Sequence, residues 1–286
     1  MYAGAENVSF SSSCFLGLQN TTVCEKLDGK YAPVSRLNWS APVSIDLGIE
    51  EKIILFNFIS LFKTQFVIPN AIGTMTDYDY FLSGAVSQYS NHTNHVDNDC
   101  CFCIDFGYVI DIGRLSLVPL FGGQYQMRKY SAWDGYVQIP EAGFSWTGSE
   151  EKKNIAGNVI SYEQHILSPF LKFQIEYDFR QNALVCGTLK YSPYIFAHCI
   201  DTHYLRNKQF DDKMRGGFSF GVELRFHFKI FGLIFSYEYT KSGSNANTYV
   251  REVGITDSSA QIISGYIPGI ESSVWHIGVI YKLSKL

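Results

Sequence analysis

The stretch GFSFGVELRFHFK, residues 217–229, alternates apolar and polar side chains along nearly its whole length. Side chains of an extended chain point alternately to opposite faces, so this stretch has one wholly apolar face. That face consists of Phe218, Phe220, Val222, Leu224, Phe226 and Phe228, and the opposite face of Ser219, Gly221, Glu223, Arg225 and His227. The alternation lasts about a dozen residues, whereas strands of soluble proteins typically have ~5–6. This pattern is typical of a membrane-barrel strand, with lipid outside and a polar lumen inside.

Two further stretches near the C-terminus repeat the pattern. LIFSYEYT, residues 233–240, and SVWHIGVIYKL, residues 273–283, also place large apolar side chains at alternate positions. Hydrophobic residues make up 46% of the chain and aromatic residues 16%. No run approaches the roughly 18 consecutive apolar residues that a transmembrane helix needs. The apolar material is therefore expected in strands.

The spacing of polar segments predicts how these strands connect. Tight connections are expected near Glu50–Lys52, Gly113–Arg114, Arg180–Asn182 and Lys229–Phe231. Long polar segments lie at residues 19–33, 67–98, 131–157, 200–214 and 242–271. Short and long connections that alternate are typical of antiparallel barrels with short periplasmic turns and long extracellular loops. The sequence therefore predicts an all-β fold: a single ten-stranded antiparallel transmembrane β-barrel domain over residues 1–286, with a groove at its extracellular mouth.

Charge and cysteine content exclude other classes of function. The net charge is −4 and no basic stripe is present, so a nucleic-acid partner is not expected. None of the seven cysteines forms a CxxC pair, and CCFC at residues 100–103 lacks the spacing of a zinc site, so no metal is expected. Whether any cysteines pair is left open. The first ten residues have neither the basic nor the apolar region of a secretion signal, so we expect a mature form without its signal peptide.

Two short motifs contain candidate catalytic residues. In TMTDYDYFLSG, residues 74–84, Asp77 and Asp79 lie two residues apart and share one side of an extended chain. In FAHCIDTHYLR, residues 196–206, Asp201 and His203 have the same spacing. An aspartate that orients a histidine is the usual means of activating a water or hydroxyl nucleophile. Both pairs fall where predicted strands enter long polar segments, so we expect them to face one cleft at the barrel mouth.

These motifs, with three others in the same order along the chain, resemble the omptin family of outer-membrane aspartyl endopeptidases. TDYDYF at 76–81 resembles the Asp-x-Asp-aromatic motif of that family, and DTHY at 201–204 its Asp-x-His-Tyr motif. SRLNW at 35–39, YQMRKYS at 125–131 and GTLKYSPYI at 187–195 resemble further family segments. The resemblance covers nearly the whole chain and implies a place in the bacterial outer membrane.

The resemblance also implies a mechanism without a covalent intermediate. Asp201 orients His203, which takes a proton from a bound water, and that water attacks the scissile carbonyl of a peptide or protein substrate. The Asp77–Asp79 pair shares a proton and positions the water or stabilises the developing oxyanion. Two carboxylates so close do not both ionise freely, so one raised pKa is expected.

Substrate preference is where the sequence departs from the family pattern. Family members cleave between basic residues by means of an acidic S1 pocket. Glu25 aligns with one carboxylate of that pocket, but Cys199 replaces the second. A family carboxylate on the S1′ side falls near Gln88, and His92 matches another groove residue. We therefore expect a weakened preference for Arg or Lys.

The positions expected to contact lipid also differ from the family pattern. Family members bind lipopolysaccharide through basic side chains on the outer wall. The arginine of that motif is Lys129 here, beyond Tyr125, and a second basic position falls on His165. Lysine does not replace arginine at a bidentate phosphate site. We therefore expect weak contact with outer-membrane lipid, lipopolysaccharide as a poor activator, and no other cofactor.

Two other classes of function remain open. The first is a barrel that acts without proteolysis, as an adhesin, a host-protein binder or a small channel. Interior charges such as Glu223, Arg225, Glu238 and Lys282 are expected to pair and close the lumen, which disfavours the channel. The second is a soluble β-sandwich or lipocalin-like binder, but its interior would need apolar side chains where the last strands carry charges.

Overall fold

The computed structural model describes residues 7–27, 33–69, 72–180, 183–253, 261–263 and 265–285. No helix among them is long and apolar enough to cross a membrane. The strands are β1 (Asn7–Leu27), β2 (Pro33–Leu55), β3 (Phe58–Val67), β4 (Ile72–Tyr80), β5 (Val86–Tyr108), β6 (Ile110–Ile112), β7 (Leu115–Gln138), β8 (Lys153–Asn154), β9 (Asn158–Arg180), β10 (Ala183–Ser192), β11 (Phe196–His203), β12 (Lys208–Phe228), β13 (Phe231–Glu252), β14 (Gln261–Ile263) and β15 (Tyr266–Lys285).

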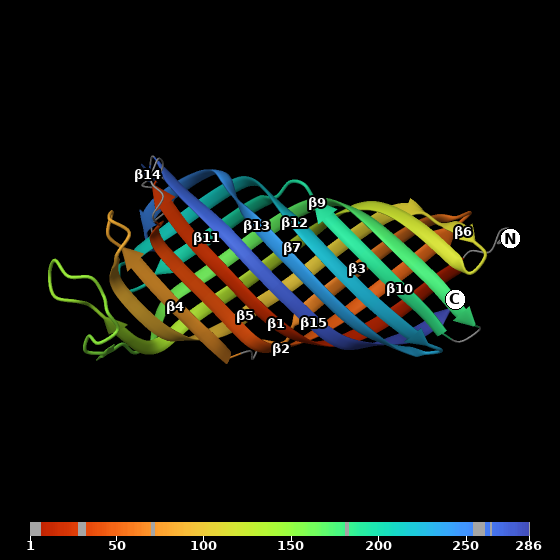
Figure 1. Cartoon of the computed structure of the whole chain (residues 1–286), viewed down its shortest axis with the longest axis horizontal. Coiled ribbons are helices and arrows are strands. Elements are labelled where there is room, and N and C mark those ends of the chain that lie inside the picture. Colours follow the sequence, from red (N-terminus) through yellow and green to blue (C-terminus); the bar gives the residue numbers. More distant parts are fainter. Residues whose placement is uncertain are drawn as a thin grey trace.

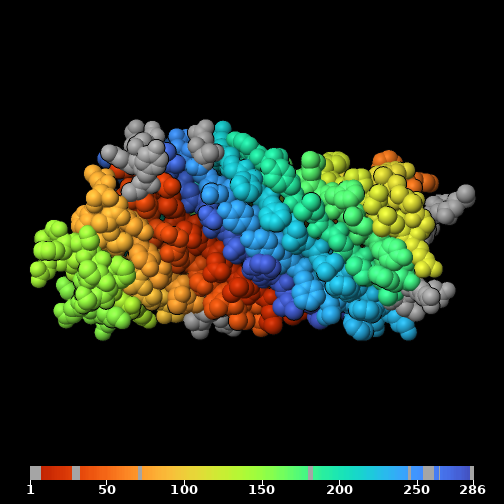
Figure 2. All heavy atoms as spheres, viewed as in Figure 1, coloured from red at the N-terminus to blue at the C-terminus, as the bar shows by residue number. Residues whose placement is uncertain are grey.

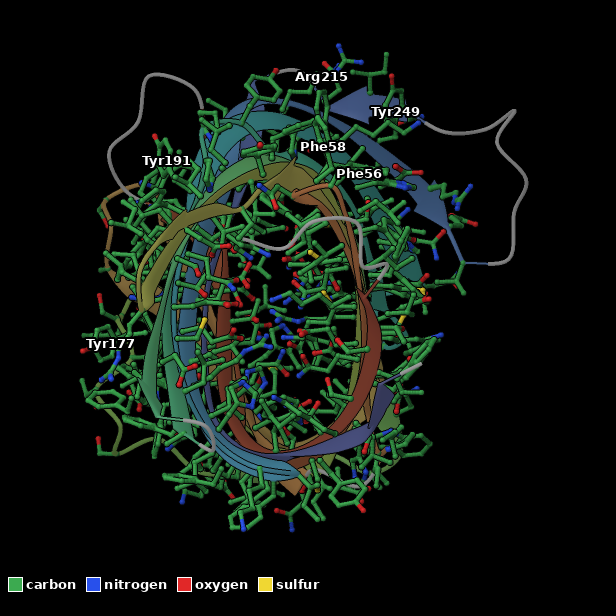
Figure 3. The ribbon with its side chains drawn as sticks, turned by 90° about the vertical axis from the view of Figure 1, so that its right-hand side faces the viewer. Phe56, Phe58, Tyr177, Tyr191, Arg215 and Tyr249 are labelled. Carbon is green, nitrogen blue, oxygen red and sulfur yellow. The ribbon has the colours of Figure 1, made fainter. Side chains whose placement is uncertain are left out.

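These strands form one closed antiparallel ring, as the sequence predicts. Strands β3 and β4 share one place between β2 and β5, and β10 and β11 share one place between β9 and β12. Pairing of β1 with β15 closes the ring at ten strand positions, and the short strands β6, β8 and β14 add to β7 and β13. The ring is oval when viewed along its axis (Figure 3). Closure leaves no unpaired edge, which is what a strand barrel in lipid requires.

Short turns lie at the end of the barrel that carries β6 and the free ends of β1 and β15 (Figure 1). The predicted turn at Glu50–Lys52 is wrong, because β2 continues to Leu55 and the turn is formed by Phe56 and Asn57, both with positive φ. The charges of Glu50 and Lys52 face the lumen, where they pair with Arg225 and Glu176. The predicted turns at Gly113–Arg114 and Lys229–Phe231 are present, and residues 181–182 of the Arg180–Asn182 turn lie outside the described residues.

At the opposite end, the predicted long loops are mostly strand. Residues 81–85 alone join β4 to β5, residues 204–207 join β11 to β12, and β13 continues to Glu252. These strands extend past the apolar band of the outer wall, so both of their faces carry polar side chains and the sequence resembles loops. The segment 139–152 between β7 and β8 is a long loop, and it projects beyond the strands at this end (yellow-green in Figure 2).

The outer wall carries the apolar face that the alternation predicts. Exposed side chains include Phe218, Val222, Leu224 and Phe228 on β12, and Trp275, Ile277, Val279, Tyr281 and Leu283 on β15. Tyr177 and Tyr191 point away from the ring (Figure 3). On β1 and β15 the apolar band ends at Leu18 and Trp275, and neither strand exposes a large hydrophobic side chain in its described residues beyond that level.

The lumen inside this band is lined by paired charges. Arg225 binds Glu50 through both terminal nitrogens at 2.8 Å and donates from Nε to Glu223 at 2.6 Å. Ion pairs also join Lys52 to Glu176, Lys172 to Asp105 and Lys190 to Glu238. The charged side chains surround a cavity of about 860 Å³, and many nitrogen and oxygen atoms lie inside the ring in Figure 3.

An apolar plug separates this cavity from the opposite mouth. Trp39 is at its centre, with its ring 5.5 Å from that of Tyr130 and 6.1 Å from that of Tyr162. Leu37, Met75, Ile195, Met214 and Ile270 belong to the same buried cluster. Alternation alone did not predict this plug, because its residues occupy the inward face of strands that carry charges further along.

We expect Arg225→Gln to destabilise the barrel by about 3 kcal/mol, because it leaves Glu50 and Glu223 without their shared guanidinium in a largely buried network. Urea unfolding in lipid vesicles measures the loss. Lys241→Gln is the matched control, because Lys241 and Glu271 are about half exposed and such pairs contribute under about 1 kcal/mol. Equal losses in the two variants would contradict the importance of the lumen network.

Candidate active site

The predicted catalytic residues lie at the mouth beyond the apolar band, on the far side of the plug. They come from strands rather than from loops: Asp77 and Asp79 from β4, and Asp201 and His203 from β11. The extended backbone turns both members of each pair to the same side, as their spacing predicts. Hydrogen bonding to neighbouring strands on both sides therefore holds each pair in place.

Asp201 and His203 form a buried pair. His203 Nε2 lies 3.0 Å from Asp201 Oδ2, and both residues are less than a tenth exposed. Burial alone lowers the pKa of His203, but the charge and hydrogen bond of Asp201, with the charges of Asp77 and Glu25, outweigh it and raise the pKa to about 9. Asp201 thus stabilises the protonated imidazole, as a histidine acting as a general base requires.

Asp77 and Asp79 differ in their surroundings. Asp77 is buried and receives a hydrogen bond of 3.5 Å from the Ser35 hydroxyl. Burial and the neighbouring Asp79 charge raise its pKa to about 7, whereas His203 and Arg206 oppose the rise. Asp79 is more exposed and is bound by the Arg206 guanidinium, with Nη2 2.6 Å from Oδ2.

The two pairs face each other across the mouth. The Asp77 charge raises the pKa of His203, and the His203 charge lowers the pKa of Asp77. Their strands, β4 and β11, are not neighbours in the ring. The oval cross-section brings the two strands close enough for their side chains to interact across the mouth. Together they can hold a water between an imidazole and a carboxyl group.

Arg206 is a site residue that sequence reasoning missed. It lies in the 204–207 tip, where Asn207 adopts positive φ, and reaches across the mouth to Asp79. No local pattern in HYLRN indicates the direction of its side chain. The ion pair links the hairpin of the Asp–His pair to the strand of the Asp–Asp pair.

Glu25 lies in the same mouth with a cluster of acidic groups. It is 5% exposed on β1, and burial with the Asp201 charge raises its pKa to about 8, against a hydrogen bond with Tyr266. Cys199 is a buried free thiol on β11, and the other six cysteines, buried or not, are also free thiols. Directly opposite Cys199 on β12 is Asp212, which sequence reasoning missed.

Gln88 and His92 lie on β5 at different depths. Gln88 pairs with Asp79 across the β4–β5 ladder, at the mouth. His92 is fully buried further down, where its Nδ1 contacts the Asp134 carbonyl and its Nε2 lies 2.9 Å from the Ser90 hydroxyl. Burial lowers the pKa of His92, so its ring is a neutral support beneath the mouth. Within the described residues, no group of three or more His, Cys, Asp or Glu is arranged to hold a metal ion.

The residues predicted to contact lipid lie together on the outer wall. The Tyr125 hydroxyl is 2.6 Å from His165 Nδ1, and Glu163 lies 2.8 Å from His165 Nε2 and 3.7 Å from Lys129 Nζ. Arg128 points inward instead and donates from Nε to Asp99 at 2.9 Å. The barrel wall therefore separates the two adjacent basic residues, and Lys129 is the one available to lipid.

The loop 139–152 supports the Asp–Asp strand from outside. Trp146 stacks on Tyr89 at 4.6 Å and meets the ring of Tyr78 edge-on at 6.0 Å. Tyr78 lies between the two aspartates on the outer face of β4. Gln138 holds the loop by donating to the carbonyls of Gly148 and Glu150 at 3.3 and 2.7 Å.

Comparison with known proteins identifies relatives of this chain. The model of the Omptin family matches residues 6–281. Outer membrane protease OmpP of Escherichia coli (strain K12) is 26% identical over 149 residues, which are 50% of this chain and 46% of OmpP. Plasminogen activator of Yersinia pestis is 29% identical over 171 residues, 54% of this chain and 49% of the activator. The chain thus spans about half the length of these curated relatives.

One solved structure shares the fold along nearly the whole chain. The crystal structure of outer membrane protease OmpT from Escherichia coli superposes with a TM-score of 0.78 and covers 96% of this chain and 97% of that one. Sequence identity is 14%, so this similarity shows the barrel fold alone.

We expect Trp146→Ala to loosen the β4–β5 hairpin without changing global stability, because aromatic pairs contribute about 0.5–1.5 kcal/mol each beyond their buried area. Hydrogen exchange measured by mass spectrometry should become faster in residues 72–92 and stay unchanged in β12 and β15. Phe144→Ala is the matched control, since Phe144 lies in the same loop but is 66% exposed. Unchanged exchange in the hairpin would show that the loop does not support it.

Proposed function

Because the chain belongs to the omptin family, we propose that it is an endopeptidase that hydrolyses peptide bonds with a water activated by Asp201 and His203. The protein is a β-barrel of the bacterial outer membrane. The observation that carries the proposal is the buried Asp201–His203 hydrogen bond facing Asp77 across the mouth. The protease names of its relatives support the same activity.

The proposed reaction begins with a water held between His203 and Asp77. His203 takes a proton from this water while Asp201 stabilises the imidazolium that forms. The resulting hydroxide attacks the scissile carbonyl carbon, and the negative charge on the carbonyl oxygen is stabilised by a proton on Asp77. We assign the shared proton to Asp77 because Arg206 already neutralises Asp79. Imidazolium then protonates the leaving amine.

The proposed substrates are peptides or proteins with Arg or Lys near the cleaved bond. Support comes from the excess of acidic groups at the mouth: Glu25, Asp77, Asp79, Asp201 and Asp212 against His203 and Arg206. A cleft lined by one sign of charge attracts and orients ligands of the other sign.

The alternative is a barrel that binds host proteins at this mouth without cleaving them. The Arg206–Asp79 ion pair favours this alternative, because it already occupies one of the two carboxylates of the Asp77–Asp79 pair. In that case the acidic mouth would act as a recognition surface only.

We expect the refolded barrel to cleave a quenched fluorescent peptide containing Arg-Arg or Lys-Lys. His203→Ala and Asp77→Asn should each lower kcat/KM by at least about 100-fold, the usual contribution of a general acid or base. His198→Ala is the matched control, since His198 lies on the same strand but binds Asp211 and is 41% exposed. The assay is run with and without lipopolysaccharide, because the Lys129 and His165 positions leave the lipid requirement open. If the folded wild-type barrel cleaves no peptide under either condition, the binding alternative is correct.

The pH profile of kcat/KM should be bell-shaped, with an acid limb near the pKa of Asp77, about 7, and a basic limb near the pKa of His203, about 9. Below the first value both groups are protonated and His203 cannot take a proton. Between the two values the pair holds one proton, and the reactive form is the one that carries it on Asp77 and leaves His203 neutral. Above the second value Asp77 has lost the proton that stabilises the oxyanion.

Arg206→Gln should move the acid limb to higher pH, because the Arg206 charge lowers the pKa of Asp77. Lys208→Gln removes a charge from the same hairpin, where Lys208 pairs with Glu252, and should leave both limbs in place. An acid limb that moves to lower pH in Arg206→Gln would refute the assignment of that limb to Asp77.

A further inference from the structure

One polar row crosses the inner wall directly beneath the Asp201–His203 pair. Strand pairing aligns Gln164 of β9, Cys199 of β11, Asp212 of β12 and Thr248 of β13 side by side. All four are at most 1% exposed. Asp212 accepts a hydrogen bond of 2.6 Å from the Thr248 hydroxyl, so one of its carboxylate oxygens is held and the carboxyl group is fixed in orientation.

Glu25 is near this row, on the other side of the mouth. The Asp212 charge raises the pKa of Glu25, and the hydroxyl of Tyr266, which hydrogen-bonds Glu25, also experiences the Asp212 charge. Stacking of Tyr266 on Phe210, with ring centroids 6.4 Å apart, connects the two walls. Glu25 and Asp212 are therefore close enough at the mouth for the charge of one to act on the other.

These two carboxyls differ from the acids in the lumen. Glu50, Glu176 and Glu238 each have an ion pair with Lys or Arg, whereas none of the described residues forms an ion pair with Glu25 or Asp212. Burial raises the pKa of Glu25 to about 8 and that of Asp212 to about 7. Buried carboxyls without a cation are costly, and proteins retain such groups where a ligand uses them.

Buried polar atoms without partners lie in the same place. Both amide atoms of Gln164 lack a hydrogen-bond partner among the described residues, and so do Asp201 Oδ1 and the Tyr162 hydroxyl. Gln164 is on the same inward row as Asp212, and Tyr162 is directly opposite Asp201. Buried groups of this kind are rare in folded proteins, and the two unpartnered acceptors, Gln164 Oε1 and Asp201 Oδ1, can receive hydrogen bonds from a ligand rich in donors.

We propose that Asp212 is the second carboxylate of a pocket that binds a substrate guanidinium, together with Glu25 and the amide of Gln164. This inference rests on the proposed function, whose substrate it specifies. The family resemblance places a second carboxylate where this chain has Cys199, and Asp212 lies directly opposite Cys199 on the partner strand. Guanidinium has five donors in a plane and can serve several acceptors on separate strands, whereas an ammonium has three donors at one point. The pocket therefore selects arginine over lysine.

Binding is tested in a His203→Ala background, so that no peptide is cleaved during the measurement. Three labelled peptides differ at one position, which is Arg, Lys or the neutral isostere citrulline, and their Kd values are measured by fluorescence anisotropy in detergent. We expect the order Arg, then Lys, then citrulline from tightest to weakest. Asp212→Asn should weaken binding of the Arg peptide by about 10- to 100-fold, in line with a lost charge-assisted hydrogen bond, and leave the citrulline peptide unchanged.

Two further variants separate the pocket from effects on folding. Asp211→Asn is the matched control, because the adjacent Asp211 points outward to His198, 2.9 Å away, and should bind all three peptides as the background does. The double change Cys199→Asp with Asp212→Asn moves the carboxylate across the strand pair and should restore much of the Arg binding. Equal weakening of the Arg and citrulline peptides by Asp212→Asn, no weakening at all, or no binding of the Arg peptide to the background would each overturn the proposal.

These outcomes are independent of the outcome for peptidase activity. A wild-type barrel that cleaves nothing but whose Arg binding depends on Asp212 would refute the peptidase and keep the pocket. A barrel that cleaves Arg peptides while Asp212→Asn binds them unchanged would keep the peptidase and refute the pocket.

Discussion

Backbone hydrogen bonds in a bilayer have no water to accept them, so every N–H and C=O in the membrane must find its partner inside the protein. Pairing of β1 with β15 meets this requirement by closing the sheet on itself. Closure also forces the alternation of side chains, since one face of every strand meets lipid and the other meets the lumen. Charges that face inward must then pair with one another, as Arg225 does with Glu50. The apolar band, the ion-paired lumen and the rigid rim that carries the candidate site all follow from closure.

The plug divides the interior into two levels, and the acidic side chains are compensated differently in each. Below the plug, each lumen acid named above forms an ion pair with a Lys or Arg side chain, so the opposite charges neutralise each other locally. Above the plug, Glu25 and Asp212 have no such partner and their pKa values are raised. The plug around Trp39, with its stack of buried aromatic rings, lies between these two levels. A surplus of acidic groups is therefore confined to the mouth end of the barrel.

The alternation in residues 217–229 was sufficient to predict the strands, their faces and the ring. In a closed barrel one face of every strand meets lipid and the other meets the lumen, and the alternation follows from this. Turn positions were less predictable: charges at Glu50 and Lys52 resemble a turn but serve the lumen. Strand length at the mouth was underestimated, since polar side chains on both faces of β13 resemble a loop. The Asp77–Asp79 and Asp201–His203 pairs were visible because each lies within one strand at a spacing of two. Arg206 and Asp212 were not, because their roles depend on a contact across the mouth and on the register between β11 and β12.

In the guanidinium pocket that we propose, the register of β11 and β12 offers two positions for the second carboxylate. Cys199 and Asp212 lie directly opposite each other, and side chains so placed in an antiparallel pair have Cβ atoms about 4.5–5.5 Å apart. A carboxylate moved from one strand to the other therefore shifts by about 5 Å and still points to the same side of the sheet. A slip of one residue in register would send it to the outer wall instead, where Asp211 points. The cross-strand pair of positions 199 and 212 thus determines whether the pocket has its second carboxylate. A sequence comparison made at position 199 alone overlooks this.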